Sequence, residues 1–179
     1  MDWNQFSKSL VELGFFRYLK PGKEKTIPRL LTKIRSTNYI FGVTEYRDYP
    51  ADEEDIGEGG AKEFLSDIKY VLNANGVVFT SIEEMPTPDA QKLLINGEEY
   101  ILCSGEELNQ SPWRIKHTIT KRLFAVINKL LREAGSKERI FSRDGGNDHW
   151  AIFLTYELYD LLAKSDFADD IKELRLYEE

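Results

Sequence analysis

Six carboxylates are concentrated in one short stretch of the chain, between residues 48 and 58. Carboxylates at this spacing can hold Ca²⁺ or Mg²⁺, or can attract a positively charged partner. The alternating ligands and closing glutamate of an EF-hand are missing, so we expect neither a metal site nor a cofactor here. The candidates for binding a basic partner are Asp48, Asp52, Glu53, Glu54, Asp55 and Glu58.

A second polar cluster lies at residues 144–149, where two aspartates and a histidine surround Gly-Gly-Asn. Such groups can serve as acid, base or metal ligand in a hydrolase. Aspartate, glycine and asparagine are also the residues that a tight turn requires, and we give the turn more weight. The weak catalytic candidates are Asp144, Asp148 and His149.

Sequence motifs of known catalytic chemistry are missing elsewhere. The chain has two histidines and one cysteine, and it contains no HExxH, CxxC or GxSxG pattern. His117 could act as a base or ligand beside Trp113, and Cys103 has the context of a small buried residue. The glycines of 57–60 resemble a phosphate cradle, but the Lys-Ser/Thr of a P-loop is absent and the nearby carboxylates would repel a nucleotide.

The net charge of −7 conceals blocks of opposite sign. Residues 45–108 carry 4 basic and 16 acidic side chains, whereas residues 109–144 carry 9 basic and 3 acidic ones. The second block places a basic side on a predicted helix, which could follow nucleic-acid phosphates. The acidic composition and the lack of a recognition motif favour an ordinary solvated face instead. That side consists of Lys121, Arg122, Lys129 and Arg132.

Hydrophobic periodicity predicts the elements that position these groups. Apolar residues at helical spacing predict helices after Asp2, over 27–35, over 61–74, from Pro112 or Thr118 to Ala134, and over 155–162. Short β-prone runs predict strands at 39–43, at 77–82, on both sides of a type I′ turn at Asn96-Gly97, and on both sides of the 144–147 turn. A last helical turn is expected around Ile171 and Leu174.

These elements predict one α+β domain over residues 1–179, with a mainly antiparallel or mixed sheet of about five to seven strands and helices packed on it. Segments 39–82 and 100–142 share a strand, loop, helix and strand order, which suggests a weak internal duplication. The chain shows no export signal and no apolar run of membrane-spanning length, and its single cysteine cannot form an internal disulfide. We therefore expect a cytoplasmic protein without membrane contact.

The charge pattern favours a protein-binding module, of the inhibitor or immunity type, that presents its acidic loop to a basic partner, with Glu106 and Glu107 as further contacts. Two alternatives remain: a hydrolase, with or without a divalent ion, that uses the 144–149 turn, and nucleic-acid binding through helix 121–132. A non-enzymatic role is favoured, while partner and oligomeric state stay open. The main prediction requires that the carboxylates stand free in water and are not paired with the basic helix.

Overall fold

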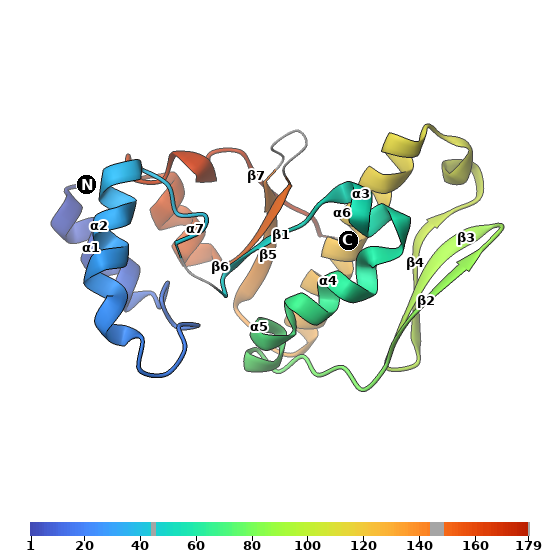
Figure 1. Ribbon diagram of the computed structural model, residues 1–179, viewed down its shortest axis with the longest axis horizontal. Helices are drawn as coiled ribbons and strands as arrows, with labels where there is room; N and C mark the ends of the chain where they lie inside the picture. Colours follow the sequence, from blue (N-terminus) through green and yellow to red (C-terminus); the bar gives the residue numbers. More distant parts are fainter. Residues whose placement is uncertain (44–45, 144–148, 179) are drawn as a thin grey trace.

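The computed structural model describes residues 1–43, 46–143 and 149–178, and it has an α+β fold with two antiparallel sheets (Figure 1). The predicted fold class is confirmed, with its strands divided between two sheets of four and three. The first sheet has the order β1 (Asp48–Pro50), β6 (Trp150–Thr155), β5 (Glu138–Arg143) and β7 (Leu174–Leu176). The second has the order β2 (Ile82–Thr87), β3 (Ala90–Ile95) and β4 (Glu98–Ser104).

The four-stranded sheet lies in the middle of the molecule and is buried on both faces. Successive residues of a strand point to opposite faces, so Ile152 and Leu154 enter one hydrophobic core, whereas Ala151 and Phe153 enter the other. The first core is covered by α1 (Trp3–Glu12), α2 (Ile27–Thr37) and α7 (Tyr156–Ala163) (Figure 1). The second is covered by α4 (Ala61–Asp67), α5 (Lys69–Ala74) and α6 (Pro112–Glu133).

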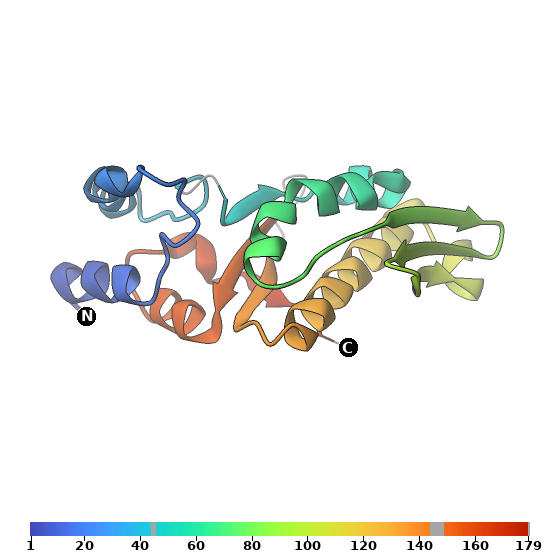
Figure 2. The ribbon, with the colours of Figure 1, turned by 90° about the horizontal axis from the view of Figure 1, so that it is seen from below.

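The three-stranded sheet lies at the far end of the molecule, against α6 and α4 (Figure 2). Its β3–β4 hairpin turns at Asn96 (φ 53°) and Gly97 (φ 88°). Both φ values are positive, as the predicted type I′ turn requires. The Asn96 side chain also accepts hydrogen bonds from the N–H groups of Thr80 and Ser81, which fastens the preceding loop to the hairpin.

Capping residues place the helix ends near the predicted positions. Asp2 accepts a hydrogen bond from the N–H of Gln5 at 2.9 Å and begins α1, and Thr155 accepts one from Leu158 and begins α7. The long helix α6 begins at Pro112, the earlier of its two predicted starts. The predicted helix over 61–74 is interrupted at Ile68, which separates α4 from α5.

Two predicted strands are wrong, because side chains take the backbone bonds that a neighbouring strand would have made. Segment 39–43 is a turn whose Ile40 and Phe41 N–H groups both donate to Asp170 Oδ2 at 2.9 Å. Segment 77–81 is a loop, and β2 begins only at Ile82. The predicted duplication of 39–82 and 100–142 stays a prediction.

The last predicted helical turn is only partly correct. A short helical turn, η4, covers Asp169–Ile171, but Leu174 lies in β7, which pairs with β5. This added strand gives the central sheet its fourth member.

A buried arginine, Arg47, connects the segment after α1 to the central sheet. Arg47 is fully buried, and its guanidinium lies 3.1 Å from the Glu138 carboxylate. It also donates to the carbonyl oxygens of Gly14, at 2.9 Å, Phe15, at 2.8 Å, and Phe153. A buried charge requires such complete pairing.

No helix in the described part of the chain is both long and apolar enough to cross a membrane.

Candidate functional site

The acidic segment folds into a kinked run of helical turns, α3 (Glu53–Asp55) and η2 (Ile56–Gly60), that leads into α4. Asp52 caps this run by accepting a hydrogen bond from the N–H of Glu54 at 2.7 Å. Gly57 packs directly on α6, because a Cβ at this position would lie 2.8 Å from Lys116 Cα. Gly57 therefore serves close helix packing, which is not the role of a phosphate cradle.

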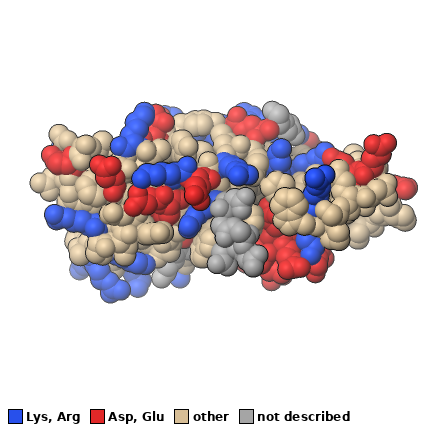
Figure 3. Space-filling view, turned by 90° about the horizontal axis from the view of Figure 1, so that it is seen from above, with Lys and Arg blue, Asp and Glu red and all other residues tan. Residues whose placement is uncertain are grey.

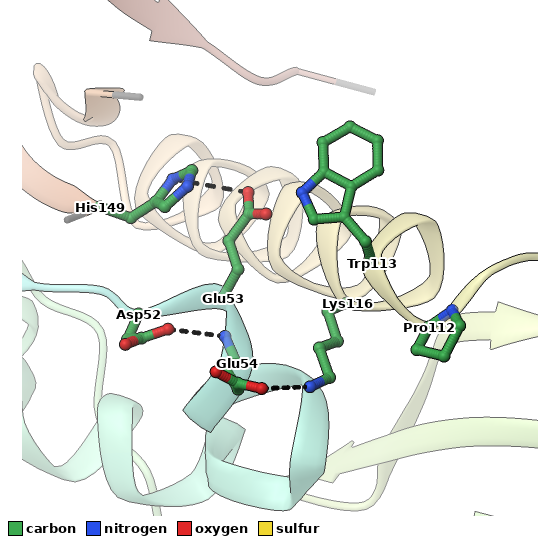
Figure 4. A pocket seen from close by; sticks show the side chains of 7 residues that line it. All are labelled: Asp52, Glu53, Glu54, Pro112, Trp113, Lys116 and His149. Carbon is green, nitrogen blue, oxygen red and sulfur yellow. Dashed lines mark hydrogen bonds and ion pairs between the residues drawn. The ribbon is translucent and has the colours of Figure 1, made fainter. Parts of the chain in front are cut away.

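A cleft of about 460 Å³ opens where this segment meets the first turn of α6 and the residue before β6 (Figure 4). The 48–58 and 144–149 clusters of the sequence thus meet at one place through His149. Asp144 and Asp148 lie outside the described residues. The cleft is lined by Asp52, Glu53, Glu54, Pro112, Trp113, Lys116 and His149.

Both histidines of the chain contact one carboxylate in this cleft. Glu53 is 8% exposed, and its Oε1 lies 2.8 Å from Nδ1 of His117 and 3.5 Å from Nδ1 of His149. These residues come from α3, α6 and the residue before β6, so no sequence spacing connects them. The sequence identified each residue as polar and titratable but carried no signal that the three would converge.

Lys116 supplies the positive charge of the cleft. Its ammonium group lies 2.7 Å from Glu58 and 2.9 Å from Glu54, and these hydrogen bonds raise the pKa of Lys116 above its usual range. The two carboxylates remain largely in water, with 72% of the Glu54 side chain and 64% of the Glu58 side chain exposed. Ion pairs this exposed are weak because water screens both charges.

Two of the six predicted partner-binding carboxylates lie inside the protein. Asp48 is 7% exposed in β1, where its Oδ2 accepts a hydrogen bond from the N–H of Gly42 at 2.5 Å. Burial raises the pKa of Asp48 to about 6. Glu53 is buried against the histidines, so neither residue belongs to an open acidic surface. The exposed members are Asp52, Glu54, Asp55 and Glu58.

The basic side of α6 makes its ion pairs away from the acidic segment. Arg122 forms an ion pair with Glu107 at 2.6 Å, and the hydrogen bonds between the two side chains lower the pKa of the Glu107 carboxyl. Lys129 binds Glu98 at 2.8 Å. The remaining two members also have local contacts, Lys121 over the Tyr177 ring and Arg132 beside Glu178. These four residues therefore do not pair with the carboxylates of residues 48–58. Such pairing would have contradicted the predicted binding of a basic partner.

Trp113 forms an aromatic wall at the mouth of the cleft (Figure 4). Its ring stacks on the imidazole of His117, with centroids 5.7 Å apart and an interplanar angle of 10°. Even so, Trp113 is 66% exposed, which is unusual for so large an apolar side chain. An exposed indole at a cleft can contact a ligand through its open surface.

The other candidates offer less chemistry. Cys103 is buried, and its burial raises the pKa of the thiol, which keeps it in the unreactive protonated form. Within residues 1–43, 46–143 and 149–178, no group of three or more histidine, cysteine, aspartate or glutamate side chains is arranged to hold a metal ion.

Comparisons of the chain with protein-family models, with curated proteins and with solved structures find no match. The geometry of the cleft therefore carries the functional conclusion.

Proposed function

We propose that this protein is a binding module for a positively charged segment of another protein, and that the cleft is its recognition site. One observation carries the proposal: the exposed carboxylates of Asp52 and Glu54 line a cleft that also presents the exposed Trp113. The exposed carboxylates of Asp55 and Glu58 lie on the same segment and line a second hollow, which shares Asp52 with the cleft. The space-filling view shows acidic side chains gathered over this segment (Figure 3). Its cytoplasmic location stays a prediction of the sequence.

The cleft matches the chemistry of a lysine or arginine side chain. Carboxylates attract and orient the cationic head group, and an indole ring binds a cation over its face. Lys116 shows that the carboxylates of Glu54 and Glu58 bind an ammonium group from within the chain. Because those ion pairs are exposed and weak, a partner's cation can join or replace them.

Binding of a fluorescently labelled lysine- and arginine-rich peptide, measured by fluorescence anisotropy, tests this function. We expect the combined substitution Asp52→Asn, Glu54→Gln, Asp55→Asn and Glu58→Gln to weaken binding at least about tenfold, since attraction to the peptide depends on these charges.

The matched control neutralises four exposed carboxylates in the α1 and α7 part of the molecule: Glu12, Glu24, Asp160 and Asp169. It makes the same change in net charge, so it should leave most of the affinity intact. Equal losses in both variants would show that the peptide responds only to net charge, and the proposal would fail.

A hydrolase is the second candidate, favoured by the contact of Glu53 with both histidines. His117 Nδ1 is hydrogen-bonded to Glu53 at 2.8 Å, and a carboxylate that accepts an Nδ1 proton orients the ring and leaves Nε2 able to take a proton from water. His149 Nδ1 lies 3.5 Å from the same oxygen, in an ion-pair contact without a hydrogen bond between the two. His149 remains the catalytic candidate here, now beside Glu53. Hydrolysis of nitrophenyl esters that His149→Gln abolishes would support this function, and equal rates in the variant would contradict it.

A further inference from the structure

We propose that the cleft selects arginine over lysine as the anchor of its partner, and that Lys116 is the residue that sets this preference. The inference rests on the proposed function and names the chemistry of its ligand. It is carried by the position of the Lys116 ammonium group, which already occupies one oxygen of Glu54 and one oxygen of Glu58.

Packing of its stem fixes the Lys116 side chain beside the cleft. Gly57 lies so close to α6 that a Cβ there would be within 3 Å of the Cα, Cβ and Cγ atoms of Lys116. The side chain is 20% exposed, and its ammonium group bridges the two glutamates on the facing segment. Because the stem is held by packing, the positive charge stays near the cleft even when a partner weakens one of these ion pairs.

An incoming lysine would compete with Lys116 for the same carboxylate. Glu54 lines the cleft and already holds the ammonium group of Lys116 at 2.9 Å. The ammonium group of a lysine is a compact point charge, and two such groups on one carboxylate repel each other. Lys116 therefore reduces the affinity that a partner's lysine can gain here.

A guanidinium group can use the oxygens that Lys116 leaves open. Asp52 accepts a hydrogen bond through Oδ1 and Glu54 accepts one through Oε1. Within the part of the chain that the structure describes, no group donates a hydrogen bond to Oδ2 of Asp52 or to Oε2 of Glu54. A guanidinium group has several N–H donors in one plane and spreads its charge over that plane. It can therefore bond both carboxylates with less charge concentrated near Lys116.

Trp113 adds a flat surface on which a guanidinium group can stack (Figure 4). It precedes Lys116 by three residues in α6, so both side chains lie on the same side of the helix and line the cleft. Its ring stacks on His117, yet the side chain is 66% exposed. A guanidinium group stacks on an aromatic face through its own plane, which an ammonium group does not have. Stacking thus favours arginine as well.

The test compares two labelled peptides that are identical except that one carries arginine and the other carries lysine at every basic position. Fluorescence anisotropy measures both affinities at one pH and one ionic strength. We expect the wild type to bind the arginine peptide about tenfold more tightly. Equal affinities, or tighter binding of the lysine peptide, would overturn the inference, and this comparison needs no variant.

Lys116→Met tests the source of the preference. It removes the ammonium group and keeps an unbranched side chain, so the lysine peptide should gain more affinity than the arginine peptide. We expect the ratio of the two affinities to fall at least about threefold. A ratio as large as that of the wild type would overturn the inference.

The matched control is Lys129→Met. Lys129 also lies on α6, is 24% exposed and pairs with two glutamates, Glu98 and Glu133, away from the cleft. The control changes the net charge equally and should keep the wild-type ratio, so an equal fall in both variants would also overturn the inference. Failure of both peptides to bind the wild type would instead be the failure of the proposed function, and this inference would fall with it.

Discussion

Single residues decide how the acidic segment is divided between interior and surface. Asp48 and Glu53 are buried, whereas Asp52, Glu54 and Glu58 remain exposed, although all five belong to one acidic run in the sequence. The sequence shows that these residues are acidic, but it does not predict which of them are exposed. Exposure follows from the pairing of β1 with β6 and from the packing of α3 on α6, which are contacts between distant parts of the chain.

Asp48 should make stability depend on pH. Burial raises its pKa to about 6 and outweighs the hydrogen bond from the Gly42 N–H, which lowers it, so the folded protein binds this proton more tightly than the unfolded chain does. Stability should therefore fall as the pH rises from about 4 to about 6, by on the order of 3 kcal/mol from this group.

Asp48→Asn removes that dependence. We expect the free energy of unfolding of the variant to increase relative to that of the wild type as the pH rises through this window. Urea unfolding at several pH values measures both. A change in stability that the new amide causes equally at every pH does not affect this slope. A difference that stays flat between pH 4 and pH 7 would contradict the assigned pKa.

The elements that were predicted correctly have local causes. Asp2 and Thr155 cap their own helices, and Asn96-Gly97 closes its own hairpin. The elements predicted wrongly have distant causes. Segment 39–43 has the composition of a strand, yet Asp170, some 130 residues away, binds its N–H groups. The ion pair of Arg47 with Glu138 also joins distant segments and has no sequence signal.

The Arg47 ion pair should be essential to the packing of the N-terminal segment. Arg47→Met leaves the buried Glu138 carboxylate without its main partner and removes three hydrogen bonds to carbonyl groups. We expect a loss of about 3 to 5 kcal/mol in the free energy of unfolding, measured by chemical denaturation. Arg17→Met, which removes the more exposed neighbour at 3.6 Å from Glu138, is the matched control and should cost much less. Equal losses would show that burial of Arg47 is not the cause.

Gly57 should be required for the packing of η2 on α6. In Gly57→Ala the new methyl group would lie within 3 Å of Lys116 backbone and side-chain atoms, so the two helices must separate. We expect a loss of about 1 to 3 kcal/mol in stability, together with weaker peptide binding. Unchanged thermal unfolding would show that the segment adjusts without cost.

At the scale of the whole molecule, the cleft exists because the chain brings together three distant segments. Residues 52–54, the N-terminal part of α6 and His149 meet at one edge of the second hydrophobic core. Periodicity predicts each element separately but not which elements become neighbours. The fold class was therefore predictable from the sequence, whereas the division into two sheets and the composition of the cleft were not.

The overall electrostatics predict strong salt dependence. The chain carries a net charge of −7, and the exposed carboxylates of Asp52 and Glu54 line the cleft, within a Debye length of a peptide bound there. We expect the affinity for a basic peptide to fall about tenfold when salt is raised from 50 to 200 mM, measured by anisotropy titration. Affinity that does not change with salt would indicate an apolar mode of binding.

The most direct test of the recognition site is a titration of ¹⁵N-labelled protein with the basic peptide, followed by NMR. We expect the indole N–H of Trp113 and the backbone amides of 52–58 and 112–117 to shift first and furthest. Shifts concentrated on α1, α2 and α7, with Trp113 unchanged, would contradict it.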